Sequence, residues 1–238
     1  MVFDGTEPRP LDSPMSATLT PSRRIPTIAD LLRRLGDIPS ERVRLEPTPG
    51  TATEADVILF SEKDGTVYEL VDGTLVEKAM GWGEIDLAYW LMGLIGDHLR
   101  EHDLGRVFGG DGLIRLGKGK VRGPDLTVLL WEHVPTPEEN EKHPIARTVP
   151  DLVVEVISRS NTPKEMARKR KEYFAAGTKV VWQVYPKTKA VEVYTSPGRF
   201  RTLGIKDSLD GGTVMPDFRL PVRTLFSPPT KPGSRRKK

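Results

Sequence analysis

The chain has 238 residues, of which 37% are hydrophobic and 29% charged, as in a soluble globular protein able to bury a core. The absence of cysteine excludes disulfides and thiolate metal sites and permits a reducing compartment, so a cytoplasmic location is the expectation. No apolar run approaches the roughly 20 residues needed to span a bilayer, so no membrane span is predicted. The formal charge is +3, but five positive charges lie between Lys231 and Lys238, and the remainder carries −2. Total charge therefore gives no sign of a broad surface for nucleic acid.

Composition divides the chain into three parts. Residues 1–24 are rich in proline, serine and threonine without periodicity, which predicts a disordered leader. Residues 25–227 are expected to form the folded domain, and residues 228–238 a disordered basic tail.

In the first half, Thr27 can cap a helix that ends at Gly36, with Ile28, Leu31, Leu32 and Leu35 on one face. An extended linker is expected at 37–55, and a hairpin at 66–77 around the turn pair Asp72-Gly73. The apolar stripe of 84–101 predicts a helix buried on one side. Residues 106–116 are expected to form a strand or hairpin, followed by a turn at 117–120.

In the second half, short apolar runs predict strands at 126–131 and 152–157, separated by a polar loop at 132–149. Thr162, Pro163 and Gly177 mark the start and end of a helix at 163–176. Two further strands, 179–185 and 190–194, and a glycine-rich turn at 210–212 complete the body. We expect one α/β domain, in which the helices after Gly83 and Thr162 pack on a sheet containing 126–131, 152–157 and 179–185.

Glu155 lies in the middle of the apolar run PDLVVEVIS (150–158). A buried ionised carboxylate is costly unless a cation, a metal or several donors meet it. One interpretation is a core glutamate paired with an arginine. The other depends on Asp125, which opens the strand LTVLLW, because two strands that each present an acid, followed by a lysine-rich helix, can hold a divalent cation against a phosphate.

Other chemistries find little support in the sequence. There is no cysteine nucleophile, no GxSxG sequence, no GxGxxG after a strand and no HExxH spacing. His98 and His102 can share a helical face, but no third zinc ligand is evident. Phosphodiester hydrolysis, in contrast, requires carboxylates for a metal and a cation near the developing charge, which 125, 155 and the helix at 163–176 can supply.

The order YELVDGTLVE, GPDLTVLL, PDLVVEVIS and K-x-x-x-Y-x-x-x-G before VVWQVYP resembles the Uma-type putative restriction endonucleases of the PD-(D/E)XK nuclease superfamily. The resemblance runs from about Ile28 to Phe226 and implies a mixed β-sheet flanked by helices, with a restriction-endonuclease-like core and a Mg²⁺ (or Mn²⁺) site. Asp125 would match the acid of the PD motif, and Glu155 the second acid.

The superfamily places a lysine two residues beyond the second acid, where this chain has Ile157. A lysine on the following helix is the expected substitute: Lys169, four residues before Tyr173, with Lys171 as the second choice. Glu69, in the hairpin, is an additional candidate acid, although it can equally be an exposed glutamate. Asp111, in GGDG, is a weaker candidate.

Three hypotheses therefore stand. The first is a metal-dependent DNA endonuclease that acts as a homodimer, since duplex cleavage often pairs two sites about a two-fold axis. The second is a nuclease-fold protein that binds nucleic acid or a partner without cutting, which the slightly acidic body and the missing lysine favour. The third is a structural or interaction protein whose buried acids are only salt-bridged.

Overall fold

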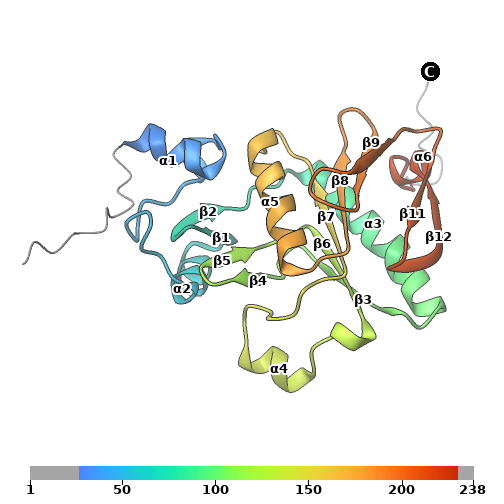
Figure 1. Cartoon of the computed structure of the whole chain (residues 1–238), viewed down its shortest axis with the longest axis horizontal. Coiled ribbons are helices and arrows are strands. Elements are labelled where there is room, and N and C mark those ends of the chain that lie inside the picture. Colours follow the sequence, from blue (N-terminus) through green and yellow to red (C-terminus); the bar gives the residue numbers. More distant parts are fainter. Residues whose placement is uncertain (1–26, 230–238) are drawn as a thin grey trace, which may run out of the picture.

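The computed structural model describes residues 27–229 and shows a mixed α/β protein built on two main sheets (Figure 1). The leader expected at 1–24 lies outside the described residues, as does the expected tail beyond its first two positions. The helices are α1 (Ile28–Leu35), α2 (Glu54–Asp64), α3 (Trp82–Glu101), α4 (Pro137–Lys142), α5 (Pro163–Ala176) and α6 (Val222–Leu225), with 3-10 turns at Ser40–Arg42 and Trp131–His133. The strands are β1 (Tyr68–Val71), β2 (Thr74–Glu77), β3 (Gly105–Gly109), β4 (Ile114–Gly117), β5 (Lys120–Arg122), β6 (Leu126–Leu130), β7 (Leu152–Val156), β8 (Val180–Tyr185), β9 (Ala190–Tyr194), β10 (Phe200–Leu203), β11 (Ser208–Gly211) and β12 (Met215–Pro221).

The larger sheet has six strands in the order β10-β9-β8-β7-β6-β3. Only β7 and β8 run parallel among these neighbours, and α5 is the crossover between them. The sheet unites the three strands expected at 126–131, 152–157 and 179–185, which confirms that part of the predicted fold.

Both faces of the central strands are covered, as their continuous apolar runs predict. On one face α3 contributes Leu91 and Ile95 to a core that includes Val154. On the other face Val153 packs with Tyr173 of α5. Because successive side chains of a strand alternate between faces, Glu155 is directed to the same side as Val153, towards α5.

The smaller sheet has the order β2-β1-β5-β4, with antiparallel neighbours throughout. Its apolar residues form a core with Val57 of α2 and a second one with Leu31 and Leu35 of α1. Helix α5 contacts β4 of this sheet as well as β8 of the larger one, and Figure 1 shows it, in orange, at the junction of the two. The two-stranded sheet β11-β12 and helix α6 share the core that α3 forms with the larger sheet, and Phe218 of β12 stacks on Trp182 of β8.

Local signals explain the elements that position the site. Thr162 accepts a hydrogen bond from the Glu165 N–H, Pro163 is the first helical residue, and Gly177 ends α5 with a left-handed conformation. Thr27 and Gly36 delimit α1 in the same way. The Asp72-Gly73 turn joins β1 to β2, and the turn at 117–120 joins β4 to β5.

Four local expectations were incomplete. The segment 37–55 is not a plain linker, since it contains a 3-10 turn and a buried Arg42. No element was expected between 56 and 65, where α2 runs; Val57 is its only buried residue, so its apolar periodicity is weak, although Thr53 and Asp56 form a capping box. The loop at 132–149 includes the short helix α4, which has no buried residue. Ile28 is exposed rather than packed with the rest of its face.

None of the helices within residues 27–229 is both long and apolar enough to cross a membrane.

Candidate functional site

Asp125 and Glu155 lie beside each other where β6 pairs with β7. The antiparallel register of β6 and β7 ends at the pair Leu126–Val154, which Asp125 precedes on one strand and Glu155 follows on the other. The Asp125 N–H donates to the Val154 carbonyl (3.1 Å), and Asp125 Oδ2 accepts the Val156 N–H (2.6 Å). The sheet therefore brings together two buried carboxylates that are distant in sequence.

Lys169 extends from α5 to the same place and is also buried. Its Nζ lies 3.3 Å from Glu155 Oε1 and 2.8 Å from Glu69 Oε1, so the ammonium bridges the two carboxylates. The Tyr173 hydroxyl donates to the same Glu155 Oε1. The interpretation of Glu155 as a paired core residue is thus correct in one respect, but its cation is a lysine and not an arginine.

Glu69 comes from β1 of the smaller sheet and is fully buried, not exposed on its hairpin. It accepts hydrogen bonds from Arg122 Nη1 (2.8 Å) and the Gly123 N–H (3.1 Å). Arg122 in turn contacts Glu172 of α5 at 2.7 Å. This chain of charges ties the two sheets and α5 together around Glu155.

Burial and neighbouring charges make Glu155 hold its proton more tightly than an ordinary glutamate does. Burial raises its pKa, the charges of Asp125 and Glu69 raise it further, and Lys169 only partly opposes them, so the pKa reaches about 7. Burial also disfavours ionisation of Glu69, but Lys169 and Arg122 outweigh it and hold that pKa at about 2. For Lys169 the cost of burial is overcome by Glu155 and Glu69, which raise its pKa and keep it charged. The site can therefore accept additional positive charge at Glu155.

Lys78 makes a second cationic contact with the acid pair. Its Nζ lies 2.9 Å from Asp125 Oδ1 and donates to the carbonyls of Gly110 (2.8 Å) and Pro124 (3.2 Å). Three acceptors match the three N–H donors of an ammonium group, so this side chain is held in one place.

The structure does not gather every candidate residue at the acid pair. Lys171 is exposed on the outer side of α5, which leaves Lys169 as the helix lysine that contacts Glu155. Asp111 is exposed and lines a cavity that also contains Asp125. His98 and His102 stack on each other, and their ring nitrogens contact the carbonyls of Pro216 and His98 respectively.

Sequence reasoning missed four side chains of the site: Lys78, Arg122, Glu172 and Tyr173. A signal was present in α5, because Glu165, Lys169, Glu172 and Tyr173 recur at helical spacing on one face. The sequence analysis used only Lys169 and Lys171 of this helix as candidates. The whole stripe is buried, and at its start Glu165 forms a two-point contact with the buried Arg42 (2.8 and 3.1 Å).

A different group of potential metal ligands lies near the start of β7. Oxygen or nitrogen atoms of Glu132, His133 and Asp151 lie within 4.8 Å of one another. Lys179 Nζ, 2.8 Å from Asp151 Oδ1, already supplies a cation there, and His133 Nδ1 and the Leu130 N–H both contact Oδ2.

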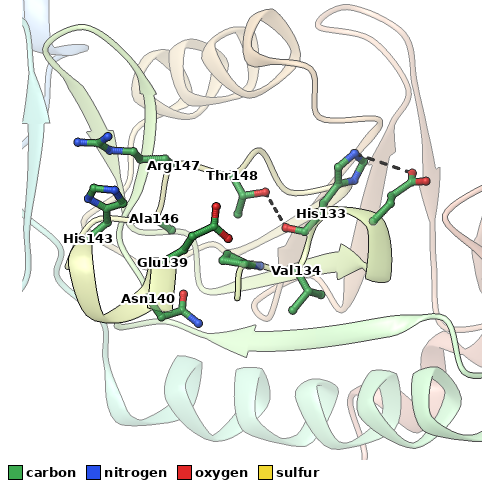
Figure 2. Close-up of a pocket in the computed structure, with 10 residues that line it drawn as sticks. His133, Val134, Glu139, Asn140, His143, Ala146, Arg147 and Thr148 are labelled. Atoms are coloured by element: carbon green, nitrogen blue, oxygen red, sulfur yellow. Dashed lines mark hydrogen bonds and ion pairs between the residues drawn. The ribbon is translucent and has the colours of Figure 1, made fainter. Parts of the chain in front are cut away.

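Glu132 and His133 also border a cavity of about 420 Å³. Figure 2 shows the His133 ring turned away from Glu139, Asn140 and His143 across that cavity. We therefore treat the group as an ion-pair network and not as part of the acid-pair site.

The sheet, the crossover helix and the buried acids define a protein of the restriction-endonuclease-like class. The chain belongs to the Uma2 family, described as putative restriction endonucleases, whose model matches residues 37–223. A crystal structure of a putative nuclease belonging to DUF820 from Anabaena variabilis is similar in fold, with a TM-score of 0.62 at 19% identity over 68% of this chain and 91% of that chain. No curated protein matches the sequence. The family and the fold support a nuclease-type enzyme.

Proposed function

We propose that this protein is a metal-dependent DNA endonuclease whose catalytic residues are Asp125, Glu155 and Lys169. The observation that carries the proposal is a pair of buried carboxylates beside the Leu126–Val154 pair of β6 and β7, with a lysine ammonium in contact with one of them. This donor set is the one that phosphodiester hydrolysis requires.

The residues fit a hard divalent cation, Mg²⁺ or Mn²⁺, which binds carboxylate oxygens. Among residues 27–229, the only hydrogen-bond contact to Glu155 Oε2 is from Lys169, at 3.5 Å, so this oxygen keeps lone pairs for a ligand bond. Asp125 and Glu155 would hold the ion. When bound, it would supply Lewis-acid stabilisation of the phosphate and activation of the attacking water.

The chain's own groups act around these two acids. The Val156 N–H and Lys78 orient the Asp125 carboxylate from both sides, while Tyr173 fixes Glu155 Oε1. Lys169 offsets the charge of Glu155 and Glu69, and in the proposal its positive charge also stabilises the charge that develops on the phosphate. Glu69 holds Lys169 in position, so its role is to position and not to bind the substrate.

Three further parts of the proposal concern the substrate, the oligomeric state and the cellular location. We infer DNA as the substrate from the family name, a homodimer from the symmetry of duplex cleavage, and a cytoplasmic location from the lack of cysteines. Sedimentation that finds only monomer at micromolar concentration would remove the dimer from the proposal.

The alternative function is a catalytically weak or inactive nuclease-fold protein that binds nucleic acid or a partner. Two observations favour it: Ile157 stands where the superfamily has its lysine, and Lys169 is fully engaged by Glu69 and Glu155. A lysine that must serve two buried carboxylates has less charge to offer a phosphate.

A cleavage assay tests the proposal. Purified protein is incubated with supercoiled, linear duplex and single-stranded DNA in Mg²⁺, Mn²⁺ or EDTA, alongside Asp125→Asn and Glu155→Gln. We expect metal-dependent cleavage that both substitutions abolish while circular dichroism shows an intact fold. Lys169→Ala is compared with Lys171→Ala, which removes an exposed lysine from the same helix and should cleave like wild type.

Wild-type protein that binds DNA but cleaves no substrate in either metal would establish the alternative function. Cleavage that survives Asp125→Asn and Glu155→Gln would show that the activity belongs to other residues.

A further inference from the structure

A cavity of about 750 Å³ has Asp125, one acid of the pair, in its wall. Asp125 and Lys78 stand at its wall, together with Ile85, Tyr89 and Met92 of α3 and Phe108 of β3. Its volume falls within the range of about 300–1,000 Å³ that is usual for pockets that bind small molecules. The wall is mainly apolar and aromatic, which is not what a channel for phosphates alone would require.

The side of α3 that borders this cavity carries two large exposed aromatic residues. Trp82 is 85% exposed and Tyr89 is 69% exposed, and the seven-residue spacing places them on one face with Ile85 and Met92. The opposite face of α3, with Leu91 and Ile95, covers the larger sheet. Met92 packs against that core, whereas Trp82 and Tyr89 are not part of it, and stacking of nucleic-acid bases is one use for such rings.

Polar groups close the other side of the cavity. In the glycine-rich segment 109–112 the Gly110 carbonyl accepts from Lys78 and the Gly109 carbonyl accepts from the Gly112 N–H, while Asp111 adds an exposed carboxylate that can accept from the edge of a base. A Cβ at Gly110 would lie 3.0 Å from Lys78 Nζ, so the absence of a side chain there lets the loop close over the lysine. The cavity thus combines apolar surfaces with a carboxylate that can pair with the edge of a base.

We propose that this cavity takes a base of the DNA substrate that is unstacked from its neighbours, so that the protein binds a single strand more tightly than a duplex. The inference rests on the proposed nuclease function, since it places the base beside the phosphate presented to Asp125. In a duplex each base is covered by its neighbours, and extracting one costs a few kcal/mol. The chain without its basic tail carries a formal charge of −2, so stacking and not broad phosphate neutralisation supplies the affinity.

Binding measured in EDTA tests the inference without requiring cleavage. The probes are a fluorescein-labelled single strand of mixed sequence and the same strand annealed as a blunt duplex, followed by fluorescence anisotropy. We expect the wild type to prefer the single strand. Tyr89→Ala should weaken single-strand binding by about tenfold, Trp82→Ala should weaken it in the same direction, and Tyr89→Phe should bind like wild type because it keeps the ring.

Trp131→Ala is the matched control, because it also removes an exposed tryptophan, which contacts Asp103 and does not line the cavity. It should bind the single strand like wild type.

Equal affinity for single strand and duplex, or unchanged single-strand binding in Tyr89→Ala, would overturn the inference. If Tyr89→Ala and Trp82→Ala instead convert a dimer to a monomer while single-strand affinity is unchanged, the aromatic face is a contact between two copies and the inference is wrong. If Tyr89→Ala cleaves both substrates in a metal-dependent way at wild-type rates, the proposed nuclease function is supported and only the base pocket is contradicted. If Tyr89→Ala loses the preference for the single strand but the wild type cleaves no substrate, the base pocket is supported and the nuclease function is contradicted.

Discussion

Replacing Glu155 by glutamine should stabilise the metal-free protein increasingly as the pH rises. The pKa of Glu155 is raised from an ordinary value of 4.5 to about 7, first by burial and then by Asp125 and Glu69. The folded state therefore binds this proton more tightly than the unfolded state, so the stabilisation is present below the unfolded pKa and is lost as the pH rises through about 7. At about 1.4 kcal/mol per pKa unit, the loss amounts to about 3 kcal/mol. Glutamine cannot ionise, so the Glu155→Gln variant does not lose this stabilisation as the pH rises.

Urea unfolding followed by tryptophan fluorescence in EDTA measures the effect in both proteins between about pH 5 and about pH 8. The free energy of unfolding of Glu155→Gln relative to wild type should increase by about 2 kcal/mol or more over this interval. Acids that do not interact with Glu155 titrate alike in both proteins and cancel in the difference.

Glu165→Gln is the matched control, because it also removes a buried carboxylate from the same network. Burial disfavours ionisation of Glu165, but Arg42 outweighs it and lowers the pKa. The stabilising contribution of the Glu165 carboxylate is therefore complete above its unfolded pKa. The difference in free energy of unfolding between Glu165→Gln and wild type should stay constant over the same pH interval. A flat difference for Glu155→Gln as well would refute the electrostatic account of the acid pair.

Three further outcomes are expected. Lys169→Met should destabilise the protein by about 3–5 kcal/mol, because it leaves two buried carboxylates without their shared cation, whereas the exposed Lys171→Met should stay within about 0.5 kcal/mol of wild type; urea midpoints decide between them. Gly36→Ala should cost about 1–3 kcal/mol, since Gly36 has φ +98° and a Cβ there would lie 2.8 Å from the Glu165 backbone nitrogen; a melting temperature equal to that of wild type would contradict this. Mn²⁺ should raise the melting temperature of the wild type more above pH 7 than at pH 6, as the pKa of Glu155 at about 7 implies, and should not raise that of Asp125→Asn. An equal rise in the variant would locate the metal elsewhere.

Much of the fold follows from patterns that are local in the sequence. The apolar runs at 126–131, 152–157 and 179–185 require cover on both faces, and they form neighbouring strands of one sheet. Caps such as Thr162 and Gly177 locate helix ends, because they satisfy backbone groups that the helix leaves unpaired. Weakly periodic elements were not predicted. Helix α2, for example, buries only Val57, so its hydrophobic spacing carries little information.

The site divides in the same way. The sequence by itself determined that an acid lies inside a buried strand at 155, that another opens a strand at 125, and that no lysine follows at 157. Those facts depend on residue type and local burial, which a single chain segment reveals.

Only the tertiary structure decided which charges meet. The pairing of β6 with β7 places Asp125 and Glu155 beside the Leu126–Val154 pair, and α5, packed against both sheets, carries Lys169 to Glu69. Whether Glu69 is exposed or buried, and whether 169 or 171 faces inward, depends on how a helix rotates between two sheets joined by distant segments. Such pairings are set by the summed packing of many apolar contacts, and no local pattern encodes them.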